Sequence, residues 1–200
     1  MTNREKDMLS NIFEKALTGK SIFINRQVLR SDFIPEKLPF REEQINIIGH
    51  IFAPILQDSK PSNLLLYGKT GSGKTAVAKY VLSKFDETTK QHNKLISLAY
   101  SNARLAGSEY RVLVDLAHSL DMDMPFTGLP ISEVLQRIYN NISNNNLKVI
   151  FIIDEIDYLA KHAKNSNDDM LYSLTRSSEH LKQGFISLIG ISNDLHFKAF

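Results

Sequence analysis

The feature of this sequence that most restricts its fold is a glycine-rich loop between two apolar segments. The loop, GKTGSGKT at residues 68–75, follows the apolar run 64–67 and precedes Val77, Val81 and Phe85, which recur at helical spacing. It fits the pattern G-x-x-x-x-G-K-[ST], in which glycines let backbone N–H groups wrap a phosphate at the start of a helix. The order of strand, loop and helix therefore predicts a phosphate-binding loop in an α/β fold.

Two side chains of this loop have predicted roles of their own. Lys74 supplies a cation to the β- and γ-phosphates of a nucleoside triphosphate, and the Thr75 hydroxyl ligates Mg²⁺. The alternative is a surface turn that is rich in glycine and lysine. The residues predicted to contact the nucleotide here are Gly68, Lys69, Thr70, Gly71, Ser72, Gly73, Lys74, Thr75 and Ala76.

Polar side chains also follow two later apolar runs. Asp154 and Glu155 end the run 149–153, and Asn193 follows the run 186–191. Ligand sites of parallel sheets lie at the carboxyl ends of strands, so we expect Asp154 to hold the water shell of Mg²⁺ and Glu155 to activate the attacking water. Asn193 is predicted to sense the γ-phosphate or the hydrolytic water. The alternatives are a helix cap or solvated turn for the acids and an Asn-Asp turn for Asn193.

The remaining pattern alternates strands with helices, which predicts a parallel sheet. Residues 1–20 carry a weak helical pattern and are predicted to form a leader helix, and residues 21–200 to form one ATPase core. Two prolines within 31–40 favour an extended segment there. The predicted strands are 64–67, 95–100, 149–153 and 186–191. Besides the leader helix and the helix after the phosphate loop, the predicted helices are 41–57, 109–120, 130–142 and a segment that follows the polar loop 162–168 and continues to Leu181.

Composition excludes several classes of function. The 200 residues contain no cysteine, which excludes a disulfide scaffold, a thiolate zinc site and a cysteine nucleophile. No apolar run approaches the ~20 residues of a membrane span, and the N-terminus lacks the apolar core of a signal peptide. We therefore expect a cytoplasmic protein without a membrane partner. The formal net charge of +2 does not by itself predict binding to nucleic acid.

Several segments together resemble one family. They are FIPEKLPFREEQI at 33–45, the phosphate loop, VIFIIDEID at 149–157, GISND at 190–194 and SEYRVLVDLAHSLD at 108–121 with PFTG after it. Over about residues 20–200 the sequence is similar to the archaeal replication initiators related to the origin recognition complex and to cell division control protein six, within the AAA+ ATPases. The resemblance implies a three-layer P-loop NTPase core, with ATP and Mg²⁺ as cofactors and slow hydrolysis as a switch.

The resemblance also implies partners and further site residues. Duplex origin DNA would be gripped by the insertion 102–128, through Arg104 and Arg111, and a replicative helicase or other initiator subunits would be further partners. Ile34, Pro35 and Arg41 would close over the adenine. The composition of 101–128 itself supports DNA binding weakly, because the segment contains two arginines and four acidic residues, a net charge of −2. An ordinary amphipathic helix is the alternative.

Members of this family continue with a fifth core strand, an arginine finger, a lid with a second sensor arginine and a winged-helix domain, and none of these is found by Phe200. We therefore expect a partial version of the family that binds ATP weakly, hydrolyses it very slowly and self-associates through the edge of the strand 64–67. Two other functions stay open. One is another AAA+ ATPase of DNA transactions, such as a transposition helper or clamp loader, and the other is a nucleotide-responsive interaction module without turnover.

Overall fold

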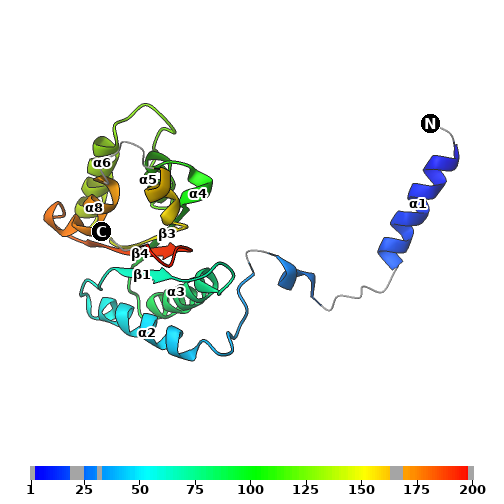
Figure 1. The fold of residues 1–200 in the computed structure, drawn as a ribbon, viewed down its shortest axis with the longest axis horizontal. Coiled ribbons are helices and arrows are strands. Elements are labelled where there is room, and N and C mark those ends of the chain that lie inside the picture. Colours follow the sequence, from blue (N-terminus) through cyan, green and yellow to red (C-terminus); the bar gives the residue numbers. More distant parts are fainter. Residues whose placement is uncertain (1–2, 19–24, 31–32, 163–168, 198–200) are drawn as a thin grey trace. The chain divides into compact units, whose positions relative to one another are not determined.

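A computed structural model describes residues 3–18, 25–30, 33–162 and 169–197, coloured along the chain in Figure 1. Its contacts divide the chain into two compact units, 1–35 and 36–200, which are described separately. The first unit contains helix α1 (Asn3–Thr18) and the 3-10 helix η1 (Arg26–Leu29), which begins where Asn25 Oδ1 accepts the Gln27 N–H at 2.9 Å. The predicted domain boundary between residues 20 and 21 lies outside the described residues and stays a prediction.

The second unit alternates strands with helices. In the part of the chain that is described, no helix is both long and apolar enough to cross a membrane. The elements are α2 (Glu42–Phe52), η2 (Ala53–Gln57), β1 (Leu64–Tyr67), α3 (Lys74–Gln91), β2 (Ser97–Asn102), α4 (Ala103–Ala106), α5 (Glu109–His118), α6 (Ile131–Asn144), β3 (Lys148–Asp154), α7 (Asp157–His162), α8 (Asp169–Thr175), η3 (Ser177–Glu179) and β4 (Phe185–Ser192).

The four strands form one parallel sheet in the order β1-β4-β3-β2, which confirms the predicted α/β class. Strands β3 and β4 lie in the middle and are buried on both faces, as their unbroken apolar runs predict. The register aligns Tyr67 with Ser192, Asp154 with Ile191, and Asn102 with Asp154. The carboxyl ends of all four strands therefore meet along one edge of the sheet.

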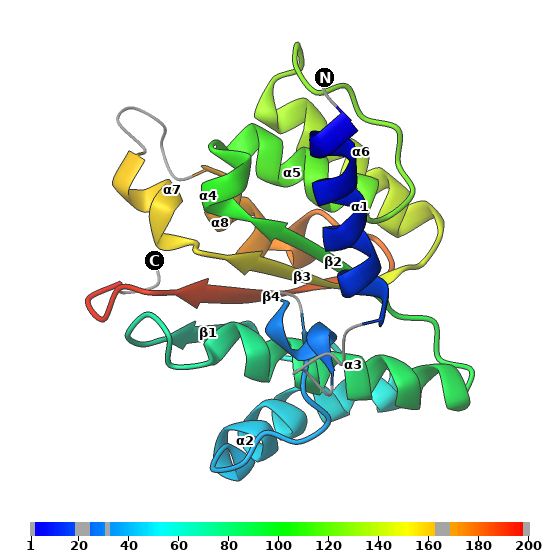
Figure 2. The same ribbon diagram turned by 90° about the vertical axis from the view of Figure 1, so that its right-hand side faces the viewer.

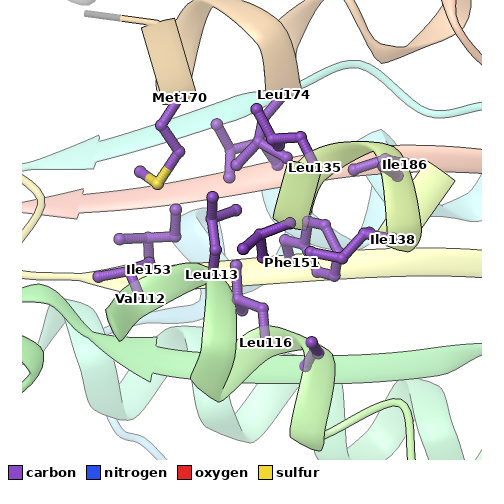
Figure 3. Close-up of a cluster of buried hydrophobic side chains, with 14 of the residues drawn as sticks. Val112, Leu113, Leu116, Leu135, Ile138, Phe151, Ile153, Met170, Leu174 and Ile186 are labelled. Atoms are coloured by element: carbon purple, nitrogen blue, oxygen red, sulfur yellow. The ribbon is translucent and has the colours of Figure 1, made fainter. Parts of the chain in front are cut away.

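Helices cover both faces of the sheet, which gives three layers (Figure 2). Helices α2 and α3 pack on one face, where alternate residues of the central strands, such as Ile150 and Ile152, meet Phe52 and Val81. Helices α5, α6 and α8 cover the other face. Their apolar residues enclose Phe151 and its neighbours in the cluster of Figure 3. This alternation along β3 fixes which way each following side chain points, because a shift of one residue would exchange the two faces.

Several predicted boundaries are corrected by the structure. The helix predicted over 41–57 ends as an α-helix at Phe52 and continues as the 3-10 helix η2, which contains Pro54. The strand predicted over 95–100 spans Ser97–Asn102, and the short helices α4 and α7 were not predicted. The helix predicted to reach Leu181 ends at Thr175. Of the predicted loop 162–168, residues 163–168 lie outside the described residues.

Candidate functional site

The phosphate loop connects β1 to α3 at the carboxyl edge of the sheet. Gly71 and Gly73 have φ of 78° and 84°, a left-handed conformation that favours glycine. Gly73 is also the residue from which α3 starts, and its carbonyl accepts the Val77 N–H at 2.9 Å. Lys74, Thr75 and Ala76 form the first turn of α3. The free N–H groups of this turn and the positive end of the helix dipole are suited to an anion.

Lys74 is held by oxygens from two segments. Its ammonium Nζ donates to the Gly68 and Lys69 carbonyls at 2.9 and 3.0 Å, and to Asn193 Oδ1 at 2.8 Å. Asn193 follows β4, which neighbours β1 in the sheet, so the pairing of these strands brings the amide to the loop. The structure thus places Lys74 and Asn193, which lie 119 positions apart in the sequence, in direct contact.

Asp154 ends β3, and its side chain is turned toward the phosphate loop. The residue is 6% exposed. Its Oδ2 accepts the Thr75 hydroxyl at 3.0 Å and the Tyr100 hydroxyl at 3.0 Å, and its Oδ1 accepts the Glu155 N–H at 2.9 Å. Burial, followed by the charge of Asp154, raises the pKa of Tyr100, so this phenol stays a hydrogen-bond donor. The structure brings together the two predicted magnesium ligands, Thr75 and Asp154.

Their chemistry fits Mg²⁺, which prefers oxygen ligands and is held in nucleotide sites by one or two side chains together with phosphate oxygens. Within the described ranges no three His, Cys, Asp or Glu side chains gather as a metal cluster. The Thr75 hydroxyl and the Asp154 carboxylate would therefore supply only part of the magnesium ligands, and phosphate oxygens would supply others.

Glu155 directly follows Asp154 and adopts a left-handed backbone with φ of 51°, which is unusual for a residue with a side chain. Its carboxylate is 30% exposed and lies 3.7 Å from the Arg104 guanidinium. Arg104 belongs to α4, whose start is capped by Asn102 at the end of β2. The residue predicted to contact DNA therefore touches the residue predicted to activate water.

The loop that carries Asn193 is fastened to the start of α7. Asp157 Oδ1 accepts the Asn193 N–H at 3.0 Å and the Ser192 hydroxyl at 3.1 Å, and its Oδ2 accepts from Lys161 at 3.3 Å. Lys161 also lies 3.0 Å from Asp194. Burial acts to raise the pKa of Asp157, but these hydrogen bonds outweigh it and lower the pKa. Asp157 is thus an ionised support for the loop after β4.

Arg41 reaches the phosphate loop from the start of α2. Its Nη2 donates to the Ser72 carbonyl at 2.8 Å. Beside it lies a cavity of about 370 Å³, walled by β1, the loop and α2. Its lining residues are Arg41, Gln44, Ile48, Leu65, Leu66, Tyr67, Gly68, Ser72, Lys74 and Val77. Apolar walls next to a phosphate loop suit a nucleobase.

For three other predicted residues the contacts within the second unit do not test the predicted role. Ile34 and Pro35 belong to the first unit, so their role at the adenine stays a prediction. Arg111, on α5, lies over the Phe126 ring at 4.9 Å and donates to the Phe126 carbonyl at 3.4 Å. Its guanidinium therefore helps to fasten the 121–130 loop, and its role toward DNA also stays a prediction.

Two supports of the site were missed in the sequence. Tyr100 is the last residue of the predicted strand 95–100, so the strand-end rule that singled out Asp154 applied to it as well. Asp157 lies three residues after Asp154 in the DEID run, where a first-turn acid suits a short helix. No sequence motif indicates the partner of either residue, because Tyr100 contacts the end of β3 and Asp157 contacts the end of β4.

Comparisons with known proteins agree with this geometry. A family model described as an AAA domain matches residues 57–197. The ORC1-type DNA replication protein of Cenarchaeum symbiosum is 42% identical over 197 residues, which are 97% of this chain and 48% of that protein. A solved structure of the Aeropyrum pernix ORC1 protein in complex with DNA has a TM-score of 0.80 at 39% identity, and the match covers 87% of this chain and 44% of that one.

The Aeropyrum pernix ORC2 protein, solved as ADPNP-ADP complexes, shares the fold with a TM-score of 0.76 at 22% identity, over 86% of this chain and 46% of that one. The chain spans about half the length of the curated relatives it matches. The AAA model covers well over half of the chain, and the similarity to ORC1-type proteins extends over nearly all of it, as the sequence segments predicted. The chain therefore belongs to the AAA domain family and is similar, within it, to the archaeal ORC1-type DNA replication proteins.

Proposed function

We propose that this chain binds and hydrolyses ATP with Mg²⁺ and serves as the ATPase core of a DNA replication initiator. One observation carries the proposal. Lys74 with Asn193, and Thr75 with Asp154, meet in hydrogen bonds of 2.8 and 3.0 Å at the end of a phosphate loop. These contacts join the loop to the ends of β3 and β4. Nucleotide hydrolysis needs a cation and metal-binding oxygens close to the terminal phosphate.

Phosphate binding follows from the free donors of the site. Backbone N–H groups of the loop and of the first turn of α3 would donate to the phosphates, and Lys74 would add a full positive charge. In this structure Asn193 Oδ1 accepts one of the Lys74 protons. A γ-phosphate oxygen would take over as the acceptor, and the Asn193 amide would then be free to donate to that phosphate or to the attacking water. Asn193 would in this way respond to whether the γ-phosphate is present.

Thr75 and Asp154 are the residues that would hold the metal ion. When bound, Mg²⁺ neutralises charge that develops on the β- and γ-phosphate oxygens. Glu155 would orient and deprotonate the attacking water, and its 30% exposure leaves it open to solvent on one side. Its carboxylate lies 3.7 Å from the exposed Arg104 guanidinium, a contact that it would give up for the attacking water.

The base is expected beside Arg41, in the cavity walled by β1 and α2. Packing a face of the aromatic base against Ile48 and Leu66 would add affinity in proportion to the apolar area covered. The closure of Ile34 and Pro35 over the adenine belongs to the same proposal.

The similarity to ORC1-type replication proteins supports replication initiation as the setting for this ATPase. The Aeropyrum ORC1 protein is seen in complex with DNA, and a Drosophila ORC bound to DNA matches with a TM-score of 0.62. We propose duplex origin DNA as a partner through 102–128, with the exposed Arg104 as the first contact to test. Other initiator subunits and a replicative helicase are further proposed partners.

Self-association is proposed through β1. Among the described residues, β1 pairs only with β4, so its other side offers free N–H and C=O groups. An apolar groove of about 300 Å³ lies beside it, with Leu64, Leu171 and Tyr172 in its lining. An apolar edge strand is a template for another chain. Sedimentation velocity tests this, because a monomer throughout the micromolar range would contradict it.

Two substitutions test the central proposal. Lys74→Ala should abolish binding of a fluorescent ATP analogue, because it removes the fixed cation that faces the β- and γ-phosphates. Glu155→Gln keeps the shape of the side chain and removes only the base, so binding should persist while phosphate release falls by about 10² to 10⁴. Unchanged affinity in Lys74→Ala would sink the assignment. Phosphate release no higher in the parent chain than in Glu155→Gln would favour a module without turnover.

A further inference from the structure

The carboxylate of Asp154 is held by three donors from three different elements. Thr75 comes from α3, the Glu155 N–H from the chain after β3, and Tyr100 from β2. The proposed mechanism uses Asp154 and Thr75 but gives Tyr100 no role. Its hydroxyl nevertheless shares one oxygen, Asp154 Oδ2, with the hydroxyl of Thr75, and both distances are 3.0 Å.

The strand register explains how Tyr100 reaches this oxygen. Tyr100 is aligned with Ile152, and Asn102 is aligned with Asp154. Since side chains alternate along a strand, Tyr100, Ile152 and Asp154 all face the α3 side of the sheet. Tyr100 therefore lies diagonally from Asp154 by two residues, and a long side chain spans that separation where a short one would not.

The ring of Tyr100 is fixed from the other side by α3. The Lys79 ammonium lies 4.9 Å from the ring centroid. Lys79 comes four residues after Thr75, so the same face of α3 holds both the ring and the carboxylate. Tyr100 itself is 37% exposed, and its outer side borders a polar hollow lined by Asn102, Arg111 and other residues. The side chain of Tyr100 is thus held at its ring by Lys79 and at its hydroxyl by Asp154.

We propose that Tyr100 is a positioning residue for the magnesium site, an inference that rests on the proposed function. It fixes the rotation of the Asp154 carboxylate, so that Oδ2 and the Thr75 hydroxyl are presented together to the ion. Without the phenol hydroxyl, Oδ2 keeps one donor instead of two and the carboxylate turns more freely. Loss of such an outer hydrogen bond commonly weakens metal affinity by about 10- to 100-fold. At this partly exposed position we expect the lower end, about tenfold.

The test is Tyr100→Phe, which removes the hydroxyl and keeps the ring beneath Lys79. Tyr110→Phe is the matched control, because the Tyr110 hydroxyl donates to the Pro125 carbonyl at 2.8 Å, away from Asp154. Binding of a fluorescent ATP analogue is measured with EDTA and then along a Mg²⁺ titration. In Tyr100→Phe the affinity with EDTA should stay within about twofold of the parent chain, and the Mg²⁺ concentration for half-maximal effect should rise about tenfold. Tyr110→Phe should change neither.

Phosphate release is followed along the same titration. We expect Tyr100→Phe to recover most of the parent rate at saturating Mg²⁺, because the substitution leaves Glu155 and Lys74 in place. A merely structural role would weaken binding equally with and without Mg²⁺. That result would overturn the inference, as would an unchanged or lower Mg²⁺ requirement. Either outcome leaves the proposed function standing as long as the parent chain binds the analogue and Lys74→Ala does not.

Lys79→Met provides a second variant if Tyr100→Phe fails to fold, as judged by circular dichroism. It keeps the hydroxyl but removes the cation above the ring, so Tyr100 is held less firmly. We expect a smaller shift of the Mg²⁺ requirement in the same direction. A Mg²⁺ requirement equal to that of the parent chain would then overturn the inference.

Discussion

Asp157 offers the sharpest test of how the strand ends are held together. Its side chain is 13% exposed and connects α7 to the loop after β4. One carboxylate oxygen accepts both the Asn193 N–H and the Ser192 hydroxyl, at 3.0 and 3.1 Å. Substitution to alanine leaves these two donors without that acceptor, and substitution to asparagine keeps a neutral acceptor of nearly the same shape.

The magnitude follows from these contacts. A hydrogen bond to a charged acceptor contributes about 1.5–3 kcal/mol to stability, and water can reach part of this loop. We therefore expect Asp157→Ala to lower the free energy of unfolding by about 2–4 kcal/mol, and Asp157→Asn by about half as much. Lys161 adds little to either value, because its side chain is 56% exposed.

Urea unfolding followed by circular dichroism measures both changes, since the chain has no tryptophan to report by fluorescence. Asp86→Asn is the control. Asp86 makes an ion pair with the exposed Lys90 on α3, at 2.6 Å, outside the site. The control should change the free energy of unfolding by less than about 0.5 kcal/mol. Asp157→Ala that is no more destabilising than Asp86→Asn would refute the reasoning.

The pH dependence gives an independent check. The pKa of Asp157 is lower in the folded chain than its ordinary value of 3.8. Its contribution to stability is therefore present above the unfolded pKa and is lost as the pH falls through the folded pKa. The difference between the parent chain and Asp157→Asn should be full at neutral pH and should shrink below about pH 4. A difference that grows in acid would show that the charge of Asp157 does not stabilise the fold.

Two further predictions concern backbone and surface. Gly184→Ala should lower the free energy of unfolding by more than about 2 kcal/mol, because the φ of Gly184 is +72° and an added Cβ would lie 2.2 Å from the Leu147 carbonyl oxygen. Gly49→Ala should instead raise the free energy of unfolding by about 0.5–1 kcal/mol, because Gly49 is helical and an added Cβ would meet nothing within 4 Å. Equal effects in urea would contradict this. Arg104→Ala should keep the urea midpoint, because its 3.7 Å contact with Glu155 is exposed. It should weaken the affinity for duplex DNA, measured by fluorescence anisotropy, and that affinity should fall less steeply with salt concentration. Unchanged DNA affinity would remove Arg104 from the proposed surface.

The sequence predicted the central strands well because burial on both faces leaves an unbroken apolar run. The same rule misplaced β2. The predicted strand includes the apolar Leu95, which in the structure is 90% exposed and precedes β2. The predicted strand ends before the polar Ser101, which in the structure is 2% exposed and donates its hydroxyl to Asp115 at 2.8 Å. From the sequence alone, a polar residue that is buried with a hydrogen-bond partner looks the same as a polar residue in a loop, because the partner is not visible.

Short helices escaped prediction for a different reason. Helix α7 has six residues, fewer than two turns, so no apolar repeat develops along it. Its place depends on contacts from another strand, since the Ile156 N–H just before it donates to the Ile191 carbonyl at 3.0 Å. The side chains that support the site have the same character. Tyr100 and Asp157 are recognisable only once the strand order shows which loops are neighbours.

The contacts at the carboxyl edge of the sheet form a closed ring. Lys74 binds Asn193, the loop of Asn193 is bound by Asp157, and Asp157 follows Asp154 in the chain. Asp154 then accepts from Thr75, which adjoins Lys74. Because the ring is closed, the loop of Asn193 is bound both to the phosphate loop, through Lys74, and to the start of α7, through Asp157. The hydrogen bonds of Lys74, Thr75 and Asp157 therefore fasten the phosphate loop to the ends of β3 and β4.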